Sequence, residues 1–296
     1  MRLLRHRLHS DGPIRHAAVI EYELTDDRVT IADRWTYVWG ARRRPFIHPL
    51  RSAGGSVLTC DAPDDHPWHH GLWFTIKFVN GENFWEEYDD YGVLRHVGPP
   101  EVHQQDGRLD VRGSLQWVRP DRSTVVLAEH RVLTHHELGA DSYRIDLDTS
   151  LVPQVDVVFD RTPFTTWGGY GGLTLRGAPS WRDTRLLLSD GSEHQQIHGV
   201  PARWCDLRGL TDAGPAGVAM FDHPGNPRHP VPWYASTRAD TYGDGWANFV
   251  NAAFLWDAPV TVAAGESLRM RHGVLVYGEA LDRQAIDGAH EAYLSS

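Results

Sequence analysis

The sequence has little cysteine, no long apolar run and no excess of positive charge, and each of these absences excludes a class of protein. Its two cysteines, Cys60 and Cys205, have no CxxC spacing, so we expect reduced thiols and no disulfide framework. No apolar run approaches the roughly 18 residues that a membrane helix needs. The formal net charge is −10, which argues against nucleic acid as a partner because binding phosphate requires a cationic surface.

The start of the chain, MRLLRHRLHSDGP, is basic but lacks the apolar core of a signal peptide. We therefore expect a cytoplasmic protein that acts without a membrane. The basic run Arg42–Arg44 is a local exception to the acidic composition, and a solvated turn is its plainest interpretation. Symmetric self-association is the usual expectation for such a chain, and a homo-oligomer is compatible with the sequence.

The pattern of hydrophobic residues predicts strands almost throughout. Short runs rich in Val, Leu and Tyr alternate apolar with polar residues, and turn signals such as Asn80-Gly81 separate them. Neither a fixed-period repeat nor a linker-like tract is visible. We predict an all-β fold, a single large antiparallel β-sandwich over residues 1–296, with a possible helix only in the tail, residues 279–296. The clearest predicted strands are residues 113–118, 123–135, 142–152, 155–160, 184–191, 216–223 and 268–278.

The stretch DDHPWHHGLWF, residues 64–74, places His66, His69 and His70 within five residues. A proline and a glycine inside it leave no room for a useful helix, so we predict a loop that leads into a strand. The histidines then lie at the mouth of that strand, which is a common position for functional residues.

Upstream of this loop lies His48, before a proline, and downstream an Asn-Gly turn sends the chain back. That hairpin is expected to bring Glu87 toward His70. Histidines beside a carboxylate suit acid–base catalysis near neutral pH and also divalent-metal binding, although no HExxH-type spacing is present. Packing and hydrogen bonding to backbone are the structural alternative. The candidate catalytic residues are His48, His66, His70 and Glu87, and the candidate ligands of a divalent metal are His66, His69 and His70.

Two further segments suit ligand contact. Residues 221–234, FDHPGNPRHPVPWY, form a proline-stiffened loop with polar side chains, and a braced connection is the alternative interpretation. Residues 162–177 are rich in glycine without the order of a phosphate loop, which predicts a bulge where backbone approaches a ligand or another strand. The candidate substrate-binding residues are Trp73, Trp167, Tyr170, Asp222, His223, Asn226, Arg228, His229 and Trp233.

Several of these segments together resemble the bacterial DUF6807 family: PFIHPL, DHPWHHGLWF, NGENFW, FDHPGNPRHPVPWY and VTVAAGESLRMRHGVLVYGE. The resemblance runs from about residue 30 to residue 280. It implies a supersandwich of the galactose-mutarotase type and a sugar oxidoreductase as functional partner in sugar catabolism. It supplies no established set of catalytic residues. The label "methane oxygenase PmoA-like", which is often attached to this family, does not fit a chain without spanning helices.

The leading hypothesis is an enzyme that cleaves or isomerises a glycoside or keto-glycoside by elimination or hydrolysis. A carbonyl at C3 of a sugar acidifies the proton at C2, which a histidine such as His66 or His70 could remove while a metal or Arg228 polarises the carbonyl. A mutarotase or epimerase is the nearest variant. A non-catalytic carbohydrate-binding sandwich and a metal-dependent oxygenase are the alternatives from other classes.

Overall fold

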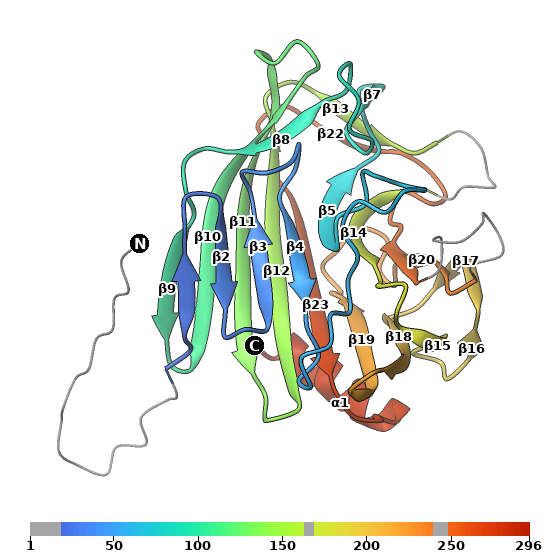
Figure 1. Ribbon diagram of the computed structural model, residues 1–296. Helices are drawn as coiled ribbons and strands as arrows, with labels where there is room; N and C mark the ends of the chain where they lie inside the picture. The colour runs from blue at the N-terminus through green and yellow to red at the C-terminus, as the bar shows by residue number, and fades with distance from the viewer. Residues whose placement is uncertain (1–18, 163–168, 239–247) are drawn as a thin grey trace, which may run out of the picture.

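The computed structural model describes residues 19–162, 169–238 and 248–296. Its architecture is an antiparallel all-β sandwich, in which a nine-stranded sheet faces a ten-stranded sheet. Figure 1 shows β2, β3 and β4 of the first sheet lying in front of the long strands of the second. A small four-stranded sheet lies at one end, and a C-terminal helix, α1, lies at the other (Figure 1).

The strands of each sheet are as follows, in their order across the sheet. The nine-stranded sheet runs β1 (Tyr22–Leu24), β2 (Arg28–Ile31), β3 (Trp35–Val38), β4 (Phe46–Leu50), β5 (Leu72–Ile76), β14 (Gly171–Arg176), β21 (Phe249–Ala252), β20 (Pro232–Ser236) and β17 (Gln196–Pro201). The ten-stranded sheet runs β16 (Glu193–His194), β15 (Arg182–Leu188), β18 (Trp204–Thr211), β19 (Gly214–Asp222), β23 (Leu268–Tyr277), β12 (Ser142–Pro153), β11 (Val125–Glu137), β10 (Arg108–Val118) and β8 (Val93–His96), with β9 (Glu101–Gln105) also paired to β10. The small sheet runs β22 (Val260–Val262), β13 (Val157–Asp160), β6 (Phe78–Val79) and β7 (Glu82–Asn83).

The predicted strands are confirmed, and the alternation in β12 shows why they form. Tyr143, Ile145 and Leu147 are buried and face the space between the two large sheets, where they join the main hydrophobic core. Removing this apolar area from water drives the two sheets together. Arg144 alternates with these residues in β12 and is buried as well, with its guanidinium 5.5 Å from the centre of the Tyr293 ring on α1.

The predicted tail helix is confirmed as α1, Arg283–Leu294, and it begins after Asp282. The Asp282 carboxylate accepts a hydrogen bond from the backbone N–H of Ala285, which caps the first turn. Within the parts of the chain that the structure describes, no helix is both long and apolar enough to cross a membrane. Both cysteines are unpaired, as expected.

Strand β5 is buried on both of its faces. Leu72, Phe74 and Ile76 face the core between the large sheets. Trp73 and Lys77 point to the opposite side, the outer face of the nine-stranded sheet, and they are buried too. The covering layer on that outer face consists of two loops, residues 60–71 and 84–91, and it holds the candidate residues His66, His69, His70 and Glu87.

Candidate functional site

The floor of the site is a group of aromatic side chains on the outer face of the nine-stranded sheet, which we call the aromatic layer. Trp85 packs 5.6 Å from Trp73 and stacks on Tyr170, with ring centres 4.9 Å apart and planes 15° apart. The sequence alternation of β4, β5, β20 and β21 sends every second side chain to this face. The layer comprises Phe46, Trp73, Trp85, Tyr234 and Phe249, with Trp68, Tyr170 and Trp256 at its edge.

The histidine loop enters β5 through Gly71, whose backbone is left-handed (φ 58°). A Cβ atom at this position would overlap the carbonyl oxygen of Ile47, so only glycine fits the turn. The predicted loop-to-strand transition is confirmed. It places His69 and His70 under the loop and leaves His66 at its edge, where 22% of the side chain is exposed.

Asp65 and His66 form a hydrogen-bonded pair that is fixed from below by an arginine. His66 Nδ1 lies 2.7 Å from Asp65 Oδ2. Arg176 on β14, almost fully buried, donates to both oxygens of the same carboxylate at 3.1 and 2.9 Å. An ionised carboxylate only accepts hydrogen bonds, so we assign the proton of neutral His66 to Nδ1 and a lone pair to Nε2.

The surroundings keep this pair in the state that a general base requires. Burial lowers the pKa of His66 below its ordinary value, and this effect exceeds the opposing influence of Asp65. Burial raises the pKa of Asp65, but its bonds to His66 and Arg176 outweigh burial, so the pKa lies below the ordinary value. At neutral pH the site therefore holds an ionised Asp65 beside a neutral imidazole.

His70 lies between two carboxylates. Its Nδ1 is 2.5 Å from Asp61 Oδ1 and its Nε2 is 3.2 Å from Glu87 Oε1. The predicted return of the hairpin to bring Glu87 beside His70 is thus confirmed. The His70 side chain is fully buried, so it positions the two carboxylates and has no ring nitrogen open to a substrate.

His48 belongs to this second group. Its Nδ1 lies 2.9 Å from the Thr59 hydroxyl, and burial lowers its pKa while the nearby Asp61 opposes the shift. The structure therefore brings the predicted catalytic residues together as two neighbouring groups: His66 with Asp65, and His48, His70 and Glu87 with Asp61.

The interpretation of Arg42–Arg44 as a solvated turn is wrong for Arg44, which is 2% exposed. Its guanidinium donates to the carbonyl oxygens of Trp68 (3.3 Å) and Trp85 and lies 3.6 Å from Glu87. A charge can be buried when it is paired and hydrogen-bonded in this way. Arg44 thereby ties the histidine loop to the loop of residues 84–91.

Lys77 and Glu86 form an ion pair at the far end of β5. Burial lowers the pKa of Lys77, and Glu86 only partly offsets this. Several buried polar atoms nearby have no hydrogen-bond partner among the described residues: Glu86 Oε2, Arg44 Nε and Trp73 Nε1. Because buried polar atoms are normally paired, this region is suited to a hydroxyl-bearing ligand or to water.

The three histidines do not fit the expected divalent metal. The rings of His66 and His69 are stacked, with centres 4.6 Å apart and planes 17° apart, so their nitrogens do not converge on one point. Both nitrogens of His70 face carboxylates. Across residues 19–162, 169–238 and 248–296, no three His, Cys, Asp or Glu side chains are grouped to hold a metal ion. We therefore derive no step through a metal.

Residues 221–234, the loop after β19, form a braced connection, which was the alternative to ligand contact. Asp222 is fully buried and accepts hydrogen bonds from Asn226 (2.8 Å), from His229 (2.7 Å) and from the backbone N–H of Val231 (2.9 Å). Burial raises the pKa of Asp222. The amide of Asn226 also donates to the carbonyl of Arg271. These contacts hold the loop against β23.

Three other residues of this loop region also form hydrogen bonds within the protein. Arg228 donates to the carbonyl oxygens of Phe254, Ala258 and Pro259, so its guanidinium is not placed to polarise a sugar carbonyl. Trp233 is fully buried in the main core, and its Nε1 donates to Ala202. His223 Nδ1 accepts from the backbone of Gly225. Within the part of the chain that the structure describes, no hydrogen bond or ion pair joins these residues to the His66 loop.

The glycine-rich segment contributes Tyr170 to the aromatic layer, whereas Trp167 lies outside the described residues. The predicted close approach of backbone is confirmed at Gly172 (φ 97°), where a Cβ would overlap the carbonyl oxygen of Ala252. Trp73 forms part of the floor, since its ring lies 5.1 Å from the His69 ring and 5.6 Å from the Trp85 ring.

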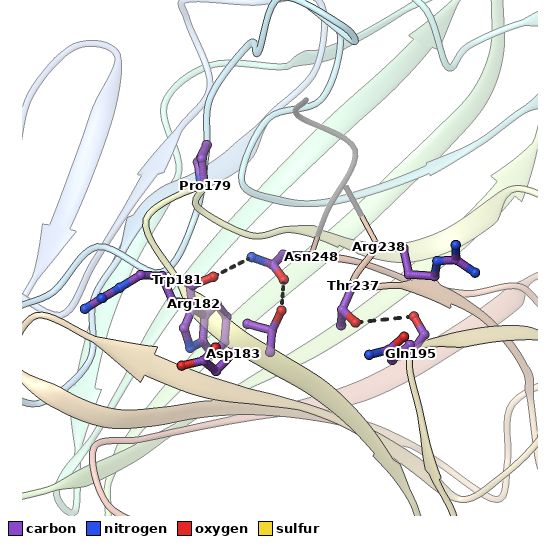
Figure 2. A pocket seen from close by; sticks show the side chains of 9 residues that line it. Pro179, Trp181, Arg182, Asp183, Gln195, Thr237, Arg238 and Asn248 are labelled. Carbon is purple, nitrogen blue, oxygen red and sulfur yellow. Dashed lines mark hydrogen bonds between the residues drawn. The ribbon is translucent and has the colours of Figure 1, made fainter. Parts of the chain in front are cut away.

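An open cleft of about 790 Å³ lies beside this site but contains none of its titratable groups. Figure 2 shows Asn248 hydrogen-bonded to Trp181. The Thr184 hydroxyl donates to the amide oxygen of Asn248, so the polar atoms of Asn248 are used within the protein. The cleft meets the site where the backbone N–H of Gly177, next to Arg176, donates to the carbonyl of Asn248. The lining residues are Pro179, Trp181, Arg182, Asp183, Thr184, Gln195, Thr237, Arg238 and Asn248.

Sequence reasoning missed several residues of the site. Asp65 directly precedes His66 and Asp61 lies five positions before it, and this proximity in sequence was a usable signal. Lys77 carried a weaker signal: it is a charged residue that follows an apolar stretch and falls on the same side of the alternation as Trp73. Arg176 is more than one hundred positions from Asp65, and only the pairing of β5 with β14 brings the two together.

Comparison with known proteins gives distant likenesses of shape. A galactose mutarotase related enzyme from Lactobacillus acidophilus matches with a TM-score of 0.42 and 9% identity over 89% of this chain and 99% of that one. An aldose epimerase homologue from C. elegans matches with a TM-score of 0.36 and 11% identity, over 88% and 100%. A polysaccharide lyase matches with a TM-score of 0.36 and 12% identity, over 88% of this chain and 32% of that one.

No curated protein matches the sequence. One family model does match, over residues 7–291, which is nearly the whole chain. The chain therefore belongs to the family of unknown function DUF6807.

Proposed function

We propose that this protein is an enzyme that acts on a neutral sugar or glycoside, with His66 as the base that removes a proton from the sugar ring. The observation that carries the proposal is the Asp65–His66 pair, held by buried Arg176 and partly exposed at the rim of the aromatic layer. A neutral histidine oriented by a carboxylate is the usual construction of a general base.

The charges around the site favour a neutral substrate. Each of the three buried cations of the site is paired with a carboxylate, which leaves none of them free to bind an anion. Aromatic faces suit the C–H faces of a sugar ring, and the unpartnered polar atoms suit its hydroxyls. The matched sets are Arg44, Lys77 and Arg176 against Asp65, Glu86 and Glu87.

The reaction we propose is elimination from a glycoside that carries a carbonyl at C3, which a partner sugar oxidoreductase would supply. His66 Nε2 takes the C2 proton, and the electron pair of that C–H bond moves toward the oxygen of the C3 carbonyl. As the C1=C2 double bond forms, the C1–O bond breaks. Protonated His66 then gives the same proton to the departing oxygen, so atoms and charge balance without water.

A mutarotase- or epimerase-like reaction is the second candidate, and one observation favours it. Glu86 lies close enough to His66 for its charge to raise the pKa of that histidine, against the larger effect of burial. A histidine and a carboxylate near one another can exchange protons across a sugar ring without an oxidised substrate.

The test is proton NMR of untagged protein with a panel of glycosides and their 3-keto derivatives, with and without EDTA. We expect turnover of a keto-glycoside that EDTA leaves unchanged and that His66→Gln abolishes. His103→Gln, an exposed histidine on β9, is the matched control and should retain activity. Turnover confined to anomeric exchange of free sugars supports the second candidate. Binding without any turnover contradicts an enzyme and supports a carbohydrate-binding module.

A further inference from the structure

A row of aromatic side chains leads away from His66. The His66 and Trp68 rings are 5.4 Å apart at 74°, the Trp68 and Tyr88 rings 5.8 Å apart, and the Tyr88 and Tyr91 rings 5.4 Å apart. We call Trp68, Tyr88 and Tyr91 the aromatic row. It is formed by the two loops that cover the site, and it is continuous with the general base.

The middle of this row is exposed, since 52% of Tyr88 is accessible. Among the described residues, the exposed large hydrophobic side chains include only two aromatic ones, Tyr22 and Tyr88. An aromatic ring left in water beside a reactive site is typical of a surface that a ligand covers.

The loop that carries Tyr88 is held by contacts on its other side. Arg122 donates to the carbonyl oxygens of Tyr91 (2.7 Å) and Asp89 (2.8 Å). Arg43 pairs with the Asp89 carboxylate at 2.6 Å. A platform that is already in place loses little conformational freedom when a ligand binds to it.

We propose that the aromatic row is a subsite for a second sugar ring, the one joined to the reacting ring through the scissile bond. This proposal rests on the proposed function, because His66 would act at the junction of the two rings. The ring faces of Trp68 and Tyr88 suit the C–H faces of a pyranose. Asp89 and Asp90, both exposed next to Tyr88, offer carboxylate oxygens to its hydroxyls. The substrate class is therefore a disaccharide or longer glycoside.

Calorimetric titration of the full-length protein tests this with sugars that lack the carbonyl and so are not eliminated. The probes are methyl glycosides of glucose, galactose, mannose and xylose, the corresponding disaccharides and the phenyl glycosides. For the sugar that binds, we expect the disaccharide to bind about fivefold more tightly than the methyl glycoside, the size of one aromatic stacking contact. Tyr88→Ala and Trp68→Ala should each remove most of this gain. Tyr22→Ala, an equally exposed aromatic on β1, should keep it.

The outcomes separate the two proposals. Equal affinity for one ring and two rings, or equal weakening of both by Tyr88→Ala, overturns the subsite and leaves the proposed function standing. If phenyl glycosides gain more affinity over the methyl glycoside than disaccharides do, the aromatic row binds an aromatic group. That result also overturns the sugar subsite. If the wild-type protein binds no sugar of the panel while circular dichroism shows it folded, the proposed function itself is contradicted.

Discussion

Single residues decide how protons move in this site. His66 is the one histidine of its loop that is both partly exposed and oriented by a carboxylate, whereas His69 is buried in the aromatic layer and His70 is held between Asp61 and Glu87. Sequence alone identified all three as candidates but could not rank them, because their roles depend on which partner each ring nitrogen meets.

Asp65 is a positioning residue, and Asp65→Asn tests its role. The amide no longer fixes the Nδ1–H tautomer of His66, so we expect turnover to fall by about 10²- to 10⁴-fold, the usual contribution of general acid–base catalysis. The measurement is kcat on the substrate found by NMR, with circular dichroism as the check on folding. An activity within twofold of wild type would show that Asp65 does not act through His66.

The pH profile tests the same pair without a change of fold. A base works when it is neutral, and burial lowers the pKa of His66, so kcat/KM should be level near pH 7 and fall only below the ordinary value of about 6.5. Asp65 raises this pKa, so in Asp65→Asn the acid limb should move to still lower pH. An acid limb that moves upward, or stays in place, contradicts the assignment.

At the scale of elements, the strands were predictable and the covering loops were not. Alternation fixes which side chains of β5 and β12 face the core, and these strands formed where the pattern placed them. The same alternation cannot reveal that Trp73 and Lys77 face a second buried layer, because that layer is made of loops without periodicity. The proline-rich loop after β19 showed the opposite: its polar residues looked functional, but Asn226 and Arg228 proved to donate to backbone carbonyl oxygens.

Gly71 links the histidine loop to β5, and Gly81 offers a matched comparison. Both have positive φ, but a Cβ at Gly71 would overlap the Ile47 carbonyl, whereas nothing lies within 4 Å of a Cβ at Gly81. We expect Gly81→Ala to lower the free energy of unfolding by about 1 kcal/mol, the cost of left-handed backbone. Urea titrations should show that Gly71→Ala lowers the free energy of unfolding by more than twice that amount. Equal losses would mean that the contact with Ile47 relaxes freely.

At the scale of the whole molecule, the sandwich buries histidines that must remain neutral. Burial lowers the pKa of His272 on β23 to about 3, and neither of its ring nitrogens has a hydrogen-bond partner among the described residues. Burial likewise lowers the pKa of His96 to about 3. The sequence showed many histidines, but not which of them the two sheets would enclose.

Acid should therefore destabilise the fold. Between pH 6.5 and 4 the unfolded chain binds a proton at His272 and the folded chain does not, so the free energy of unfolding decreases as pH falls, by about 3 kcal/mol from this residue. Urea titrations at pH 6.5 and at pH 4 measure this decrease. In His272→Leu, the free energy of unfolding should decrease between these two pH values by about 3 kcal/mol less than in wild type. His103→Leu, at an exposed site, should follow wild type. An unchanged acid dependence in His272→Leu would contradict a neutral buried imidazole.

The most direct test of the central claim is the exchange of the sugar C2 proton in D₂O, followed by proton NMR on 3-keto-glycosides. If His66 removes that proton, wild-type protein should cleave the glycoside and introduce deuterium into any substrate that returns to solution. His66→Gln should do neither while still binding the sugar. Cleavage that continues in His66→Gln, or a wild-type protein that binds the keto-glycoside with no exchange and no cleavage, would contradict the claim that His66 is the base.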